Sequence, residues 1–238
     1  MSVQEKIADG RRVAQPAGED WTHRQIRVIS IFLSVPLANV GVPANLITMT
    51  WTVLGALGVI ALGFPHYWVR VGGACLLVSS RLLDYVDGEV ARLSGRTSNR
   101  GVFLDTVGHD VIQRSLFLPL GYAIFRSTTN AAYLLCALSA SVFVGSYQTA
   151  PFIAEYAGLG DLPRDQGSIW RSRTAALLRK AVQPFYFLMK QTTALIFLGA
   201  ISDRLSWTLL YYAITAPVLF LWRVWRLSHR LKRDRQSV

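Results

Sequence analysis

Long apolar stretches separated by short polar segments run along most of this chain. Each stretch approaches the roughly 20 residues that cross the hydrocarbon core of a bilayer. Nearly all of them are apolar on every side, which is uncommon for helices of a soluble bundle, the alternative interpretation. The pattern therefore predicts an all-α integral membrane protein with six transmembrane helices. They are expected at about residues 45–64, 67–83, 111–125 (extended back to 101 if that segment is helical), 131–156, 181–201 and 207–225.

The segment before the first span, residues 21–42, mixes apolar residues such as Phe32 with basic residues such as Arg27. It is too polar to cross a membrane. An amphipathic helix lying in the headgroup layer fits the pattern, and a solvated helix packed on the bundle is the alternative. Because proline interrupts helices, Pro36 and Pro43 are expected to end this helix before the first span.

The composition agrees with a membrane protein. Hydrophobic residues make up 52% of the 238 residues and charged residues only 16%, whereas about 25% is usual in soluble proteins. Nineteen Lys and Arg residues fall on one side of the predicted spans and two on the other. By the positive-inside rule this places both termini in the cytoplasm, as in a bacterial inner-membrane protein. The net charge of +11 is then a topology signal, and no nucleic-acid partner is expected.

The predicted organisation has four parts. Residues 1–20 form a polar cytoplasmic tail, 21–42 the interfacial helix, 43–226 the six-helix transmembrane domain and 227–238 a basic cytoplasmic tail.

Acidic residues gather at the junction between the second and third predicted spans. Asp84 and Asp87 share one helix face at a spacing of three, and Asp105 and His109 share another at a spacing of four. If these faces meet, three carboxylates and an imidazole come together. Clustered carboxylates repel one another unless a cation lies among them, and such oxygen ligands suit Mg²⁺ or Mn²⁺. The alternative is that these residues are only the polar end of a span.

The same stretch resembles a known signature. From Asp84 to His109 it closely resembles the motif D-x2-D-G-x2-A-R-x8-G-x3-D-x3-D of the CDP-alcohol phosphotransferases, with histidine as its last member. Pro43, Asn45 and Thr48 resemble the P-N-x2-T that opens the first span in many members, with one extra residue after the proline. Architecture is similar over about residues 21–225, and the motifs cover about 43–110.

The resemblance implies a reaction in which an alcohol attacks the β-phosphate of a CDP-linked donor and CMP leaves. The donor would be CDP-diacylglycerol or a soluble CDP-alcohol, and the acceptor an alcohol that can itself be phosphorylated. Asp84, Asp87 and Asp105 would hold two divalent ions at the cytoplasmic side. Family members often form homodimers. The resemblance also implies that a set of motif residues lines the CMP site: Gly88, Ala91, Arg92, Ser98 and Gly101, approached by Asn45 and Thr48.

His109 departs from the family pattern, which has an aspartate as its proposed general base at this position. On a helix, residue 109 lies about 40° around the axis from Asp105, whereas Asp110 lies about 140° away, so His109 is the expected substitute. A neutral imidazole has an unperturbed pKa of about 6.5, suited to base work near neutral pH. Three interpretations stay open: His109 is the catalytic base, it is a metal ligand, or the site has lost its activity.

The acceptor site is less defined by the sequence. Lys190 falls inside the fifth predicted span, where a lysine needs a partner. With Arg171 and Arg173 it is a candidate for binding the acceptor. The alternative is that these charges set the topology and contact anionic membrane lipid.

Two other functions compete. An aspartate-rich membrane prenyltransferase also uses carboxylates and Mg²⁺, but its motifs lack the fixed glycine, alanine and arginine positions. The second alternative is a non-catalytic membrane protein whose site has decayed at position 109.

Overall fold

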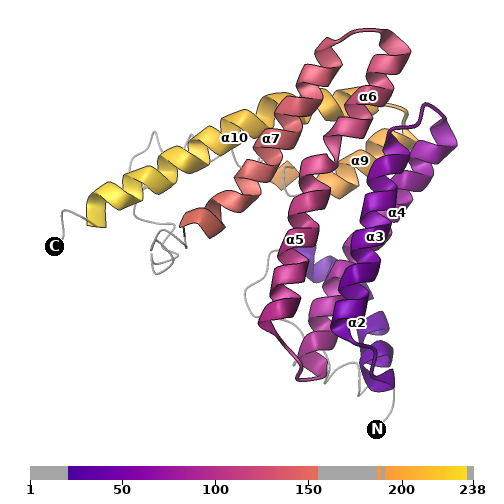
Figure 1. The fold of residues 1–238 in the computed structure, drawn as a ribbon, viewed down its shortest axis with the longest axis vertical. Coiled ribbons are helices and arrows are strands. Elements are labelled where there is room, and N and C mark those ends of the chain that lie inside the picture. Colours follow the sequence, from indigo (N-terminus) through magenta and orange to yellow (C-terminus); the bar gives the residue numbers. More distant parts are fainter. Residues whose placement is uncertain (1–20, 155–186, 189–190, 235–238) are drawn as a thin grey trace. The chain divides into compact units, whose positions relative to one another are not determined.

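The computed structural model describes residues 21–154, 187–188 and 191–234, and every regular element in this part of the chain is an α-helix (Figure 1). The all-α prediction is therefore confirmed for these residues. The chain divides into two compact units, residues 1–62 with 68–112 and residues 63–67 with 113–238. The predicted tail at 1–20 lies outside the described residues.

The first unit contains four helical segments, and apolar contacts hold them together. Ile47 of α3 packs with Val86 and Val90 of α4 in one buried cluster. Ile31 and Val35 of α2 form a second cluster. The segments are α2 (Trp21–Val40), α3 (Ala44–Leu62), α4 (Tyr67–Leu93) and most of α5 (Asn99–Ser115).

Helix α2 does not end at Pro36, contrary to the expectation from the sequence. Pro36 lies inside the helix, and the chain turns at Gly41 instead. Gly41 has φ +80°, its N–H donates to Ala38 O (3.1 Å), and the Val42 N–H donates to Leu37 O (3.0 Å). This is the Schellman arrangement, in which glycine adopts the left-handed conformation without a steric penalty. The glycine, and not the missing N–H of the proline, ends the helix.

The buried side of α2 carries polar residues beside Ile31 and Val35. Arg27 Nη1 donates to Glu89 Oε1 of α4 (3.0 Å), Ser30 Oγ to the same oxygen (2.9 Å) and Ser34 Oγ to Glu89 Oε2 (2.6 Å). Glu89 is completely buried. The opposite side of α2 is apolar and exposed, with Val28, Ile29, Phe32 and Leu33. Such a helix suits an apolar surrounding, but its position at the membrane surface stays a prediction.

The second unit contains α6 (Phe117–Thr128), α7 (Ala132–Ala154), α9 (Thr192–Ile201) and α10 (Leu205–Asp234). The Phe117 and Tyr212 rings lie 5.0 Å apart, and Ser139 Oγ of α7 donates to Ala213 O of α10 (3.1 Å). The stretch predicted as the third span is two helices, because α5 ends at Ser115 before α6 begins. The basic segment beyond 226 continues α10 as far as Asp234.

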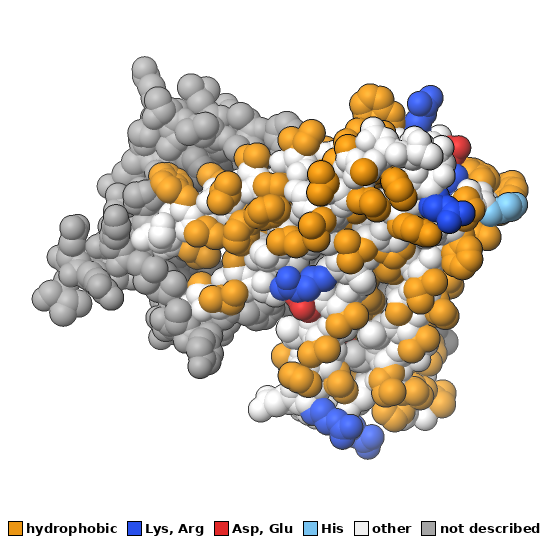
Figure 2. Space-filling view, turned by 45° about the horizontal axis from the view of Figure 1, so that its top comes forward, with side chains coloured by type: hydrophobic (Ala, Val, Ile, Leu, Met, Phe, Trp, Pro, Cys, Tyr) orange, Lys and Arg blue, Asp and Glu red, His pale blue; other side chains and the backbone are white. Residues whose placement is uncertain are grey.

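Two of the described helices are long and apolar enough to cross a membrane, Ala44–Leu62 and Leu205–Ser228. Along α3 a stripe of apolar residues is at least half exposed: Leu46, Met49, Val53, Leu57 and Ile60. Figure 2 shows hydrophobic side chains covering much of the visible surface of the described helices. A continuous exposed apolar stripe is what a lipid-facing helix presents. The number of six spans stays a prediction.

Candidate functional site

Three of the predicted site residues meet in the first unit. Asp84 of α4 and Asp105 and His109 of α5 each offer one ligand atom, and these atoms lie within 4.8 Å of one another. His109 Nε2 is 2.9 Å from Asp84 Oδ1 and 3.6 Å from Asp105 Oδ1. Two helices therefore contribute to one cluster, which we call the acidic cluster.

The local sequence explains how the two helices come to face each other. Helix α4 runs unbroken through Asp84 to Leu93, and the chain then turns at Gly95, whose φ is +63°. The Arg96 N–H donates to Ala91 O (3.0 Å), so this turn repeats the glycine cap that ends α2. Helix α5 begins soon afterwards at Asn99, and Asp105 and His109 fall one turn apart on it.

Asp84 is held from its other side by Arg81. The Arg81 Nη1 atom lies 2.6 Å from Asp84 Oδ2, which leaves Oδ1 toward His109. Arg81 also donates to the Tyr85 hydroxyl (3.3 Å), and its guanidinium lies 5.0 Å from the centre of the Tyr85 ring. Arg27 of α2 lies 5.2 Å from the same ring. The orientation of Asp84 is thus fixed by neighbours on its own helix and indirectly by α2.

Asp87 is oriented by α3. Thr48 Oγ1 and Trp51 Nε1 both donate to Asp87 Oδ2, each at 2.7 Å. Trp51 is almost fully buried, and its ring centroid lies 4.9 Å from that of His109. The sequence interpretation missed Trp51. A signal was available, since Trp51 follows Asn45 and Thr48 at helical spacings of three.

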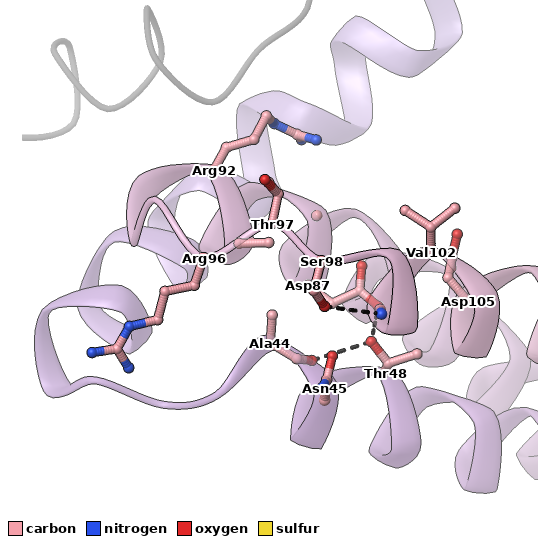
Figure 3. Close-up of a pocket in the computed structure, with 13 residues that line it drawn as sticks. Ala44, Asn45, Thr48, Asp87, Arg92, Arg96, Thr97, Ser98, Val102 and Asp105 are labelled. Atoms are coloured by element: carbon pink, nitrogen blue, oxygen red, sulfur yellow. Dashed lines mark hydrogen bonds between the residues drawn. The ribbon is translucent and has the colours of Figure 1, made fainter.

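A cavity of about 210 Å³ lies beside the acidic cluster. Asp87 and Asp105 line it, and Asp105 also belongs to the cluster. Figure 3 shows these lining residues, with Thr48 hydrogen-bonded to Asp87 and with Asp105 drawn next to Val102. All seven residues predicted for the CMP site line this cavity: Asn45, Thr48, Gly88, Ala91, Arg92, Ser98 and Gly101.

One part of the cavity lining depends on a glycine. The Gly101 N–H donates to Ser98 Oγ (3.1 Å). A Cβ at Gly101 would lie 3.2 Å from Asn45 Oδ1 and 3.4 Å from Ser98 Oγ. The absence of a side chain at this position therefore leaves the Asn45 amide and the Ser98 hydroxyl open to the cavity. The lining also includes residues that the motif did not single out: Ala44, Arg96, Thr97 and Val102.

The structure does not gather every predicted residue. Asp87 does not belong to the group of three residues whose ligand atoms lie within 4.8 Å of one another, and its Oδ2 atom accepts hydrogen bonds from Thr48 and Trp51. Lys190, Arg171 and Arg173, the candidates for the acceptor site, lie outside the described residues.

The residues of the acidic cluster fit a divalent cation. Asp105 Oδ1 is buried and receives no hydrogen bond from the described residues. Three aspartates lie around the site, and Arg81 is the cation paired with Asp84 in the structure. A buried carboxylate oxygen without a donor is costly unless a cation contacts it, and carboxylate with imidazole is a donor set that Mn²⁺ and related ions accept.

Comparison with known proteins identifies relatives of this chain. Residues 42–201 match the family model of the CDP-alcohol phosphatidyltransferases. A phosphatidylinositol phosphate synthase from Streptomyces avermitilis is 30% identical over 140 residues, which cover 56% of this chain and 55% of that protein. The chain thus spans about half the length of the curated relative that it matches.

Proposed function

Because the chain belongs to the CDP-alcohol phosphatidyltransferase family, whose enzymes release CMP in phospholipid synthesis, we propose that it transfers a phosphatidyl or phospho-alcohol group from a CDP-linked donor to an alcohol acceptor. The observation that carries the proposal is the acidic cluster beside a cavity lined by all seven predicted nucleotide-site residues. A prenyltransferase is not supported, since the matched family performs a different transfer.

The family uses divalent metal ions. We infer that Asp84 and Asp105 hold one ion, and that Asp87 contributes to a second through the oxygen that α3 leaves free. Divalent ions held there would neutralise the pyrophosphate of the donor and stabilise the departing CMP. Mg²⁺ and Mn²⁺ are the expected ions.

The cavity beside the cluster is the proposed place of the CMP portion of the donor. Asn45 offers an amide and Ser98 a hydroxyl for hydrogen bonds to the nucleotide. Arg92 lines the same cavity and brings a positive charge that suits a phosphate oxygen. Gly88 and Gly101 allow a ligand to approach the backbone closely.

His109 is the proposed general base. Asp84 Oδ1 lies 2.9 Å from Nε2, so a neutral ring that donates its Nε2–H to Asp84 leaves Nδ1 to accept the proton of the attacking hydroxyl. In the transfer, the acceptor oxygen forms a bond to the β-phosphorus, the bond from that phosphorus to the CMP oxygen breaks, and the acceptor proton passes to His109. The competing role is direct contact of His109 with a metal ion. The two roles predict different effects of His109→Ala on the metal requirement.

The substrates are inferred from the relative. The name of that relative, a phosphatidylinositol phosphate synthase, makes a phosphorylated inositol the first acceptor to test, and CDP-diacylglycerol is the donor that we would pair with it. Lys190, Arg171 and Arg173 remain the candidates for contacting the acceptor phosphate. We further propose that the chain crosses a bacterial inner membrane six times, with the site and both termini at the cytoplasmic face. It would assemble as a homodimer.

The deciding experiment measures CMP release by the purified full-length protein with Mg²⁺ or Mn²⁺, CDP-diacylglycerol or soluble CDP-alcohols, and a panel of alcohols and phosphorylated alcohols. Asp105→Asn keeps the shape of the side chain and removes its charge, so we expect it to abolish turnover. Asp203→Asn is the matched control, because Asp203 lies in the turn before α10 and should not affect the reaction.

Two outcomes would contradict the proposal. Unchanged turnover by Asp105→Asn would reject the metal assignment, and absence of CMP release with every donor would reject the activity. His109→Ala should lower kcat while leaving the metal concentration for half-maximal activity unchanged. A rise in that concentration would instead make His109 a metal ligand.

A further inference from the structure

Trp51 is placed where three helices of the first unit meet. It belongs to α3 and is the largest fully buried side chain of the described residues. Its backbone carbonyl accepts a hydrogen bond from Ser80 Oγ of α4 (2.8 Å), its indole N–H donates to Asp87 of α4, and its ring lies against His109 of α5. One residue thus contacts both helices that carry the acidic residues.

The contact with Asp87 controls the direction of a carboxylate. Trp51 Nε1 and Thr48 Oγ1 converge on the same oxygen, Oδ2, each at 2.7 Å. A carboxylate held at one oxygen by two donors cannot rotate freely, so its Oδ1 atom keeps a fixed direction. Donors behind a metal-binding carboxylate commonly have this role, and their loss typically costs 10–100-fold in metal affinity or activity.

The contact of Trp51 with α5 controls how closely His109 approaches α3. The two ring centroids lie 4.9 Å apart with the planes at 40°. A Cβ added at Gly108 would lie 2.8 Å from Trp51 Cη2, so the indole already touches the α5 backbone at this residue. The indole therefore acts as a spacer that sets how closely α5, and with it His109, approaches α3.

We propose that Trp51 is a positioning residue for the site, its indole N–H fixing the Asp87 carboxylate that would hold a metal ion and its ring fixing His109, the proposed base. The inference rests on the proposed function, since it assigns a role toward the same divalent ions. It goes beyond the family motif, which has no member at this position in the sequence.

A plain core role for Trp51 makes a different prediction. A tryptophan that only fills space can be replaced by an aromatic group of the same shape with no effect on metal binding. A tryptophan that orients Asp87 cannot lose its N–H without consequence. The two roles are separated by 3-benzothienylalanine, which has nearly the shape of tryptophan with sulfur in place of the N–H group.

The test measures Mn²⁺ binding to the purified full-length protein without substrate, by the loss of the free Mn²⁺ signal in electron paramagnetic resonance. We expect replacement of Trp51 by 3-benzothienylalanine to raise the Kd for Mn²⁺ about tenfold or more, with a melting temperature close to that of the unmodified protein. Trp51→Phe should raise the Kd similarly and also lower the melting temperature, because it leaves a cavity. Thr48→Val removes the second donor to the same oxygen and should weaken Mn²⁺ binding without disturbing His109.

Trp68→Phe is the matched control, because Trp68 is mostly exposed at the beginning of α4, and it should leave the Kd unchanged. Wild-type Mn²⁺ affinity in the 3-benzothienylalanine protein would overturn the positioning role while leaving the proposed function intact. Failure of the unmodified protein to bind Mn²⁺ would overturn the proposed metal site and this inference with it.

Discussion

Removal of the Arg27 charge is expected to destabilise the first unit strongly. Arg27→Met keeps most of the length and apolar surface of the side chain but leaves Glu89 without its cation. Glu89 is completely buried in α4 and is bound by the Arg27 guanidinium at 3.0 Å. The substitution therefore leaves a negative charge in the protein interior without a positive partner.

The magnitude follows from the partners that Glu89 retains. Ser30 and Ser34 would still donate to its two oxygens, at 2.9 and 2.6 Å, but neither brings a positive charge. Breaking one side of a buried ion pair typically costs about 3–5 kcal/mol. Replacing both partners, as in Arg27→Met with Glu89→Leu, removes the stranded charge and should recover most of that loss. Ser34→Ala alone should cost about 1.5–3 kcal/mol, the usual worth of a hydrogen bond to a charged group.

The assay is the free energy of unfolding of the full-length protein in mixed micelles of SDS and a mild detergent, followed by tryptophan fluorescence. Arg204→Met serves as the matched control, because Arg204 is exposed in the turn before α10, and its loss should change the free energy by less than about 0.5 kcal/mol. A loss below about 1 kcal/mol for Arg27→Met, or a double variant no more stable than the single one, would show that Glu89 is hydrated and that α2 does not dock on α4 as described.

Three further predictions test the packing and the metal site. Gly108→Ala would place a Cβ 2.7 Å from Thr52 Oγ1 and should lower the melting temperature and the rate of CMP release together; wild-type values of both would mean that α3 and α5 are less closely packed. In the second unit, Gly121→Ala brings its Cβ into collision with the Ala137 Cβ and should cost about 1–3 kcal/mol of unfolding free energy. As a control in the first unit, Gly72→Ala meets nothing within 4 Å and should cost nothing. Excess EDTA should abolish CMP release and added Mn²⁺ should restore it, and turnover that persists in EDTA would contradict a metal-dependent reaction.

Much of the site followed from spacing alone. Asp105 and His109 are four residues apart on a regular helix, so their shared face was predictable before any tertiary structure was known. Asp84 could be paired with them because a short connection brings α5 back alongside α4. The motif likewise placed the seven cavity residues, since they fall on the same faces of the same helices.

The supporting residues were not predictable in the same way. Spacing places Trp51 on the helix face of Asn45 and Thr48, but its contact with Asp87 depends on how α3 and α4 rotate against each other. Arg81 pairs with Asp84 at a spacing of three on the same helix, but spacing alone does not show which side chain Asp84 contacts.

The break between α5 and α6 did have a signal in the sequence, which the prediction of one long span passed over. Pro119 has no N–H to donate to the Ser115 carbonyl and its ring clashes with that group, and α5 ends at Ser115. Pro36 misled in the opposite direction, because α2 continues past it, with Pro36 on the exposed side of the helix.

The close spacing of Asp84, Asp87 and Glu89 on α4 has a consequence for how this chain can vary. Between Asp87 and Glu89 the helix turns by about 200°. One short stretch therefore lines the cavity on one side, through Asp87, and binds α2 on the other, through Glu89. A single residue inserted after Tyr85 would rotate everything beyond it by about 100°, withdrawing Asp87 from Thr48 and Glu89 from Arg27 at once. Substitutions can adjust either side separately, but the length of this stretch cannot change without losing both.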